Sequence, residues 1–262
     1  MSLLGRMLGA PLDFALPKRC AGCGEITADR GSFCPSCWAK LDFLPDHGCV
    51  RCNVPVHIAG TICGPCLQDP PRHDGVLAAI EYGDIARALA LQLKYGRKAR
   101  VADVMADLMA RNAARYPEAI LVPVPLHRWR IWQRGFNQSL LIARNVARLT
   151  GQDVRPAPII RVRRTSPLGG LNPSARRREV GGAFRMEPKE REHIAGRDVL
   201  LVDDVYTTGA TANACAGILK RAGAKSVRIL EALSDCICVE FSGLGGRGIC
   251  SGHRRSFREG SA

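Results

Sequence analysis

The sequence lacks an apolar run of the roughly 20 residues that a transmembrane helix needs, so we expect no membrane span. It also lacks a convincing signal peptide, because the apolar start is interrupted by Arg6 and is soon followed by Pro11 and Asp13. We therefore expect a cytoplasmic protein. Residues 1–19 are predicted to form a short amphipathic helix that packs on the neighbouring cysteine-rich segment.

The first part of the chain also lacks net charge. Residues 1–70 hold six basic and six acidic side chains, whereas residues 71–262 hold 32 basic against 18 acidic ones. The formal net charge of +14 therefore belongs to the second part, where a polyanionic ligand or partner is expected. A diffuse basic surface that serves only solubility is the alternative.

Neither of two common nucleotide-binding motifs is present: there is no G-x-x-x-x-G-K-[ST], and no G-x-G-x-x-G after a strand. A different strand–turn–helix pattern is found instead. The apolar run 199–202 predicts a buried parallel strand that ends just before Asp203 and Asp204, and residues 211–222 indicate a helix. Between them lies a threonine-rich turn with one glycine. Free N–H groups and hydroxyls at a helix N-terminus form a cradle for a phosphate.

The adjacent carboxylates of Asp203 and Asp204 would repel a phosphate, so they need another ligand. Ribose hydroxyls or a Mg²⁺ shell would suit them. A phosphate cradle beside such an acid pair describes a ribose 5-phosphate site, the alternative being an ordinary turn with capping threonines. Residues 199–211 resemble the signature of type I phosphoribosyltransferases. The resemblance implies that Asp203 and Asp204 are catalytic and that phosphoribosyl pyrophosphate is bound by Val205, Thr207, Thr208, Gly209, Ala210 and Thr211.

Eight of the twelve cysteines form four C-x-x-C pairs, and the second half of this pattern is the first half shifted by 29 residues. Because nothing suggests secretion, disulfides are the weaker interpretation, and two structural Zn²⁺ sites are predicted. Sequential ligation is favoured over a cross-braced arrangement, since the ten-residue loops close each site locally. The module over 20–70 is expected to be structural or a docking surface, with zinc bound by Cys20, Cys23, Cys34 and Cys37 and by Cys49, Cys52, Cys63 and Cys66.

A turn-rich segment over 69–75 marks the predicted boundary to a second domain, residues 71–233. Strands are expected over 76–82, 119–124 and 226–233, with helices over 84–94, 99–115 and 136–149. Alternation of strands and helices predicts an α/β fold with a mostly parallel sheet flanked by helices.

A second informative stretch, residues 123–139, leaves the strand over 119–124 as a proline-stiffened loop. Its arginines match phosphate oxygens in pairs and would face the first cradle across the crevice, where a pyrophosphate would lie. Arginines interleaved with Trp129 and Trp132 would also suit single-stranded nucleic acid, and a solvated basic loop is the plain alternative. The residues of this stretch that are predicted to bind substrate are Val124, Leu126, His127, Arg128, Arg130 and Arg134.

The segments Pro123–Arg128 and Arg134–Ser139 resemble the signature of the ComF competence-protein family, which also carries an N-terminal zinc ribbon. This resemblance covers roughly residues 10–233. It implies a type I phosphoribosyltransferase-like domain behind a double zinc ribbon, in a bacterial cytoplasmic protein linked in some members to handling incoming single-stranded DNA. The acceptor of the phosphoribosyl group is not implied.

Residues 161–178 carry six arginines and no acid, and they resemble the family's flexible loop, in which Arg164 and Arg176 would close over pyrophosphate. Leu168 and Glu179 depart from the family pattern, which has glutamine and asparagine there. The Gly/Arg/Ser-rich tail over 234–262 is predicted to be disordered.

The sequence supports three hypotheses about function. The first is Mg²⁺-dependent phosphoribosyl transfer from phosphoribosyl pyrophosphate to an unidentified acceptor. The second is a non-catalytic module that binds single-stranded DNA or a DNA-uptake protein through the basic cleft. The third is a zinc-ribbon adaptor whose second domain only scaffolds.

Overall fold

The computed structural model describes residues 18–27, 33–44, 48–95, 100–165 and 172–234. The helix predicted over 1–19 falls almost entirely outside these ranges, and so does the tail predicted over 234–262 apart from Ser234. Among the described helices, none combines the length and the apolar character that a bilayer-spanning segment needs.

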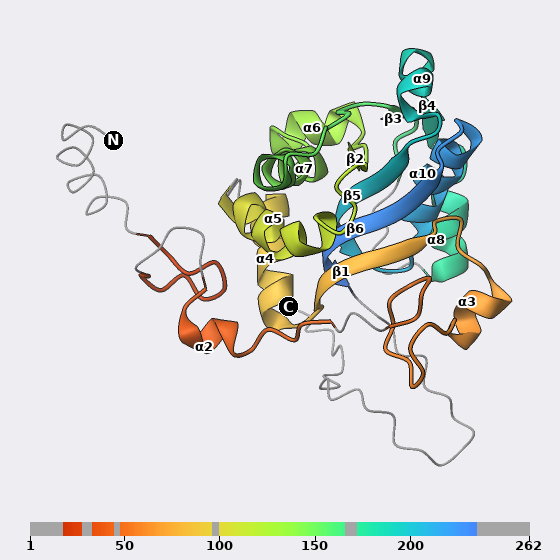
Figure 1. The fold of residues 1–262 in the computed structure, drawn as a ribbon. Coiled ribbons are helices and arrows are strands. Elements are labelled where there is room, and N and C mark those ends of the chain that lie inside the picture. Colours follow the sequence, from red (N-terminus) through yellow and green to blue (C-terminus); the bar gives the residue numbers. More distant parts are fainter. Residues whose placement is uncertain (1–17, 28–32, 45–47, 96–99, 166–171, 235–262) are drawn as a thin grey trace.

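A four-stranded parallel sheet forms the centre of the fold (Figure 1). The parallel sheet predicted from the alternation of strands and helices is confirmed. Most residues of its strands are buried on both faces, which explains why their sequences are predominantly apolar. In spatial order they are β1 (Gly75–Glu81), β6 (Ser226–Ser234), β5 (Asp198–Tyr206) and β2 (Ile120–Pro123).

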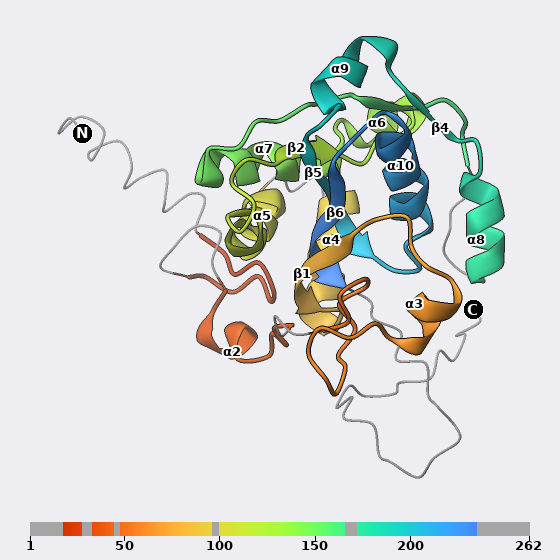
Figure 2. The same cartoon turned by 45° about the vertical axis from the view of Figure 1, so that its right-hand side comes forward.

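Helices cover both faces of the sheet, and successive strand residues alternate between them (Figure 2). Leu200 and Val202 pack toward α4 (Asp84–Tyr95), α5 (Arg100–Ala113) and α7 (Gln138–Thr150). Val199 and Leu201 pack toward α10 on the opposite face. That face also holds the antiparallel pair β3–β4. Their bounds are α10 (Ala210–Arg221), β3 (Ile159–Arg161) and β4 (Phe184–Met186).

The remaining elements are short. Two lie in the cysteine module, and the others lie in the second domain, where α8 packs against α10. They are α2 (Pro35–Trp38), α3 (Gly64–Gln68), α6 (Arg128–Arg134), α8 (Pro173–Val180), the 3₁₀ turn η1 (Pro188–Glu190) and α9 (Arg191–Ile194).

Two segments predicted as loops contain helices. The basic stretch after β2 forms α6, because His127 Nδ1 accepts a hydrogen bond from the Trp129 amide at 3.2 Å and Gly135 ends the helix in the left-handed conformation. The predicted flexible loop over 161–178 contains the start of α8, where Asn172 caps the helix and Pro173 opens it. Leu168 lies outside the described residues.

The strand predicted to end before the two aspartates is longer than expected. β5 continues through both of them to Tyr206, because β6 runs alongside and pairs with it up to Ser234. Asp203 and Asp204 are therefore strand residues, and the turn after the strand begins only at Thr207.

Candidate functional site

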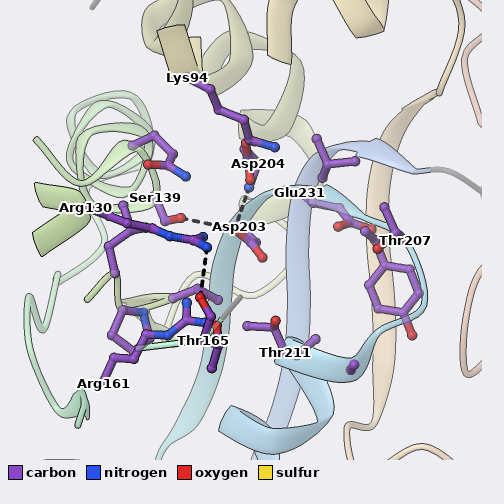
Figure 3. A pocket seen from close by; sticks show the side chains of 18 of the residues that line it. Lys94, Arg130, Ser139, Arg161, Thr165, Asp203, Asp204, Thr207, Thr211 and Glu231 are labelled. Atoms are coloured by element: carbon purple, nitrogen blue, oxygen red, sulfur yellow. Dashed lines mark hydrogen bonds and ion pairs between the residues drawn. The ribbon is translucent and has the colours of Figure 1, made fainter. Parts of the chain in front are cut away.

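A cavity of about 1280 Å³ lies beyond the carboxyl ends of β5 and β2 (Figure 3). This is the edge at which open parallel sheets bind their ligands. Its walls come from the turn after β5, the segment after β2, the start of α7 and the residues around β3. The two informative stretches of the sequence thus face one cavity.

The turn after β5 forms one side of the cavity, with Thr207 and Thr211 on it (Figure 3). Gly209 has a φ of +67° and immediately precedes α10. The first amides of a helix have no partner within the helix, so those of α10 are available to an anion. Arg176 Nη1 from α8 donates to Thr207 Oγ1 at 3.1 Å and adds a positive charge beside the turn.

The two aspartates have different partners (Figure 3). Asp204 is buried and forms an ion pair with Lys94 of α4, with 2.9 Å between Oδ2 and Nζ. Burial alone would lower the pKa of Lys94, but the charge of Asp204 outweighs it and raises that pKa. Asp203 Oδ1 accepts hydrogen bonds from Ser139 Oγ at 3.1 Å and from the Asp204 amide at 2.9 Å. Burial and the charge of Asp204 raise the pKa of Asp203 to about 7.

A third carboxylate, Glu231, borders the cavity from β6 and is the register neighbour of Asp203. Its side chain is fully buried, and neither carboxylate oxygen has a hydrogen-bond partner among the described residues. Burial, followed by the charges of Asp203 and Asp204, raises its pKa well above the ordinary value. The floor of the cavity thus holds three carboxyl groups, and within the described part of the chain Asp204 is the one that has a cation as its partner.

Positive charge is concentrated on the opposite wall. Arg130 Nη2 donates to the Thr165 carbonyl at 3.4 Å, and Arg134 Nη1 donates to Gln138 Oε1 at 3.2 Å. Arg164 lies over the Trp129 ring, 4.0 Å from its centroid. Arg161, at the end of β3, completes this wall. The cavity is therefore acidic at its floor and basic along one side.

Most of the residues predicted to bind substrate line this cavity, and two do not. His127 is used as the N-cap of α6, and Arg128 is exposed on that helix. Both are outside the lining because α6 forms where a loop was predicted. The residues brought together are Val124, Leu126, Arg130, Arg134, Arg164, Arg176, Asp203, Asp204, Val205, Thr207, Thr208, Gly209, Ala210 and Thr211.

Lys94, Ser139 and Glu231 also line the cavity and were not predicted as members of the site, whereas Arg161 was predicted only as one of the arginines of the loop over 161–178. A charged residue inside the apolar strand over 226–233 was an available signal for Glu231. Lys94 carried no such signal, because a lysine near the end of an amphipathic helix is ordinary and its partner is distant in sequence.

The eight predicted zinc ligands form two separate clusters, with sequential pairing as favoured from the loop lengths. Within each cluster the four Sγ atoms lie within 4.8 Å of one another. Zinc–sulfur bonds of about 2.3 Å in a tetrahedron place sulfurs about 3.8 Å apart. The distances of 3.7 Å between Cys23 and Cys34 Sγ and 3.6 Å between Cys52 and Cys63 Sγ agree with this spacing.

Backbone amides donate hydrogen bonds to sulfur atoms in both clusters and thereby stabilise the thiolate form. The Cys34 amide donates to Cys20 Sγ at 3.2 Å, and the Cys63 amide donates to Cys49 Sγ at 3.3 Å. Burial would raise the pKa of Cys20, but such amides outweigh it and lower that pKa to about 6. Burial and neighbouring thiols raise the pKa of Cys37 to about 12, so a cation is needed for all four sulfurs to ionise together.

Comparisons with known proteins agree with this architecture. A family model described as a double zinc ribbon domain matches residues 11–67, and one described as a phosphoribosyl transferase domain matches residues 138–234. DNA utilization protein YhgH of Salmonella typhi is 32% identical over 226 residues, which cover 84% of this chain and 89% of that protein. Competence protein F of Haemophilus influenzae is 29% identical over 220 residues, which cover 80% of this chain and 94% of that protein. The chain belongs to the ComF family.

A third relative in the ComF family, competence protein ComFC of Bacillus subtilis, is 27% identical over 72% of this chain and 78% of its own length. The family and the fold predicted from the sequence are therefore confirmed. Among solved structures, TT1426 of Thermus thermophilus covers 53% of this chain and 74% of its own at 20% identity. Its TM-score of 0.30 is too low to support any conclusion.

Proposed function

We propose that this ComF-family chain binds phosphoribosyl pyrophosphate with Mg²⁺ and transfers the phosphoribosyl group to an acceptor. The observation that supports it is the single cavity in which a helix-start turn, an acidic floor and an arginine wall meet. Such a cavity offers separate places for a phosphate, a ribose diol and a pyrophosphate.

In this proposal the 5-phosphate is bound by the amides and hydroxyls of residues 207–211, with Arg176 beside them. Asp203 accepts hydrogen bonds from the ribose hydroxyls, held in place by Ser139. Asp204 acts through Lys94, which it keeps charged at the edge of the cavity. This assignment refines the expectation that both aspartates face the ribose.

The reaction breaks the bond from ribose C1 to the pyrophosphate oxygen, and the electron pair leaves with pyrophosphate. A bond forms from C1 to the acceptor, which loses a proton. Negative charge on the leaving group develops toward Arg130, Arg134 and Arg164, and a preorganised cationic wall stabilises it. Mg²⁺ would neutralise part of the same charge, held by substrate oxygens and the acidic floor.

The test is a screen of nucleobases and related N–H acceptors for pyrophosphate release from phosphoribosyl pyrophosphate, with zinc-loaded protein and Mg²⁺. Release with at least one acceptor, lost in Asp203→Asn, is the expected result. Asp203→Asn is preferred to Asp204→Asn, since the latter would leave Lys94 without its counter-charge. Release that is unchanged in Asp203→Asn contradicts the assignment.

A second function, binding of single-stranded DNA, is favoured by the surface of α6. Trp132 is 82% exposed there, on the same helix as Arg130 and Arg134, which line the cavity. Exposed aromatic rings among arginines can stack on unpaired bases. The names of the relatives, DNA utilization protein and competence protein, are consistent with a DNA-related partner.

Salt dependence tests this second function. Oligonucleotide affinity should fall by roughly 10³–10⁵ between about 50 and 200 mM salt if six to ten phosphates are contacted. Trp132→Ala should weaken binding by about 1–3 kcal/mol without changing this slope. Binding that does not depend on salt or on Trp132 removes the DNA proposal.

We also propose a cytoplasmic location, because four-cysteine zinc sites need reduced thiols.

A further inference from the structure

Residues 207–211, proposed above to bind the 5-phosphate and called the phosphate-binding turn below, pack on the side chain of Tyr206. A Cβ atom added to Gly209 would lie 2.4 Å from the Tyr206 hydroxyl oxygen and 2.8 Å from its ring carbon Cζ. Gly209 therefore packs directly against the tyrosine, and its left-handed φ of +67° brings the chain back over the ring. Because of this contact, the position of the Tyr206 side chain limits where the turn can lie.

Tyr206 is in turn held by His73, which lies in the segment between α3 and β1. His73 is fully buried, and its Nε2 lies 3.1 Å from the Tyr206 hydroxyl, within hydrogen-bond distance. The two rings meet edge to face, with centroids 5.8 Å apart. Burial lowers the pKa of His73 to about 4, so the imidazole is neutral near pH 7 and keeps this bond across the physiological range.

The second zinc ribbon holds the backbone at His73. The Arg51 amide donates to Cys49 Sγ at 3.4 Å, inside the zinc knuckle. The side chain of the same residue donates from Nη1 to the His73 carbonyl at 3.3 Å. The segment is fixed next to α10 as well, where the Arg72 amide donates to Asn213 Oδ1 at 2.8 Å. A continuous path thus runs from a zinc ligand to the turn.

We propose that His73 and Tyr206 are positioning residues for the phosphate-binding turn, and that zinc in the second ribbon supports them through Arg51. This inference rests on the proposed function, since it assigns the turn to the 5-phosphate of the substrate. The second ribbon is then part of the active-site framework, although none of its described residues lines the cavity. The segment over 69–75, expected to be a boundary, is the connection.

The first test measures the turn itself. Hydrogen exchange of the amides over 207–211 is followed in wild-type protein, Tyr206→Phe, His73→Leu and His73→Gln, all zinc-loaded and full-length. Tyr116→Phe is the matched control, because Tyr116 packs against Arg228, away from the turn. We expect faster exchange over 207–211 in Tyr206→Phe and His73→Leu, partial recovery in His73→Gln, and unchanged exchange in β6.

Affinity for phosphoribosyl pyrophosphate with Mg²⁺ is measured on the same proteins. Losing one hydrogen bond of this kind predicts binding weakened by about fivefold to tenfold in Tyr206→Phe. Tyr206→Phe is decisive if His73→Leu fails to fold, because it keeps the ring against Gly209. Affinity within about twofold of wild type, together with unchanged exchange over 207–211, overturns the inference. Absence of binding by the wild type itself contradicts the proposed function, while the exchange data still decide on the link to His73.

The role of the ribbon is tested by Arg51→Ala against Gln92→Ala. Gln92 Nε2 donates to the Ala21 carbonyl of the first ribbon at 3.0 Å, so Gln92→Ala removes one hydrogen bond between the other ribbon and the second domain. Both variants keep all eight cysteines and two equivalents of zinc. Exchange over 207–211 should rise in Arg51→Ala only. Equal behaviour of the two variants refutes the part assigned to the second ribbon.

Discussion

The two zinc ribbons share one sequence pattern but have different surroundings. Their sulfur distances and their amide-to-thiolate bonds are nearly the same. The position that holds Arg51 in the second knuckle holds Gly22 in the first. A Cβ at Gly22 would lie 2.9 Å from Cys37 Sγ and 3.3 Å from Ile85 Cγ2, so a side chain does not fit there. The two copies thus share the cysteine geometry, and they differ at the knuckle position that in the second copy contacts His73.

Each ribbon is attached to a different part of the second domain. The first meets α4 through the Gln92 bond to Ala21, and its outgoing segment pairs with β1, where the Leu44 amide donates to the Ala79 carbonyl at 3.1 Å. The second reaches Tyr206, next to the turn proposed to bind phosphate, through His73. Loss of either metal should therefore have separable consequences.

The largest contrast is expected from removing one ligand of each site, Cys66→Ser against the equivalent Cys37→Ser. Each variant should lose one equivalent of zinc, a loss worth on the order of 10–16 kcal/mol of binding free energy in finger peptides. Affinity for phosphoribosyl pyrophosphate should fall at least about tenfold in Cys66→Ser and stay within about threefold in Cys37→Ser, as metal analysis and calorimetry would show. Equal losses in both variants would erase the distinction between the ribbons.

A smaller effect, on stability, is expected from Lys94→Met. It tests the ion pair that joins α4 to Asp204, a contact that involves neither ribbon. The change leaves the buried Asp204 without its cation, and should lower the free energy of unfolding by about 2–4 kcal/mol in a urea titration. Lys94→Met combined with Asp204→Asn should recover most of the loss. A double variant as unstable as the single one contradicts the pairing.

The smallest effect, on stability, is expected from Glu231→Gln. The pKa of Glu231 is raised by burial and by the charges of Asp203 and Asp204, so the folded state holds its proton more tightly than the unfolded chain. Its ionisation should therefore lower wild-type stability as pH rises above the ordinary value of 4.5, whereas the glutamine variant should lose less, because only the part that comes from Asp203 remains.

Urea unfolding near the ordinary glutamate pKa of 4.5 and again at a pH about three units higher measures this difference. Glu231→Gln should be more stable by on the order of 1–3 kcal/mol at the higher pH, with a smaller gap at the lower one. The exposed Glu192→Gln on α9 is the control and should show no growing gap.

The sequence was sufficient for features that depend on local spacing. The cysteine repeat predicted both zinc clusters and their pairing, and the apolar runs indicated the strands of the sheet. The turn before α10 was also predicted, and its small hydroxyl residues between a buried strand and a helix are typical of phosphate binding, which stays a prediction.

Features that depend on distant partners were not predictable. Whether Asp203 and Asp204 share a ligand is decided by Lys94, which lies more than a hundred residues earlier. The length of β5 depends on how far β6 runs beside it. His73 belongs to a linker-like segment of the sequence, and only the fold brings it to Tyr206. Local sequence was enough to predict most residues that line the cavity, whereas tertiary packing determined which of them contact one another.

The most direct measurement is a calorimetric titration of the zinc-loaded chain with phosphoribosyl pyrophosphate and Mg²⁺, in wild type and Asp203→Asn. We predict one equivalent bound per chain by the wild type. Losing a charge-assisted hydrogen bond at the ribose predicts binding at least about tenfold weaker in the variant. No binding by folded wild-type protein, or equal affinity in the two proteins, would contradict the proposed ribose 5-phosphate site.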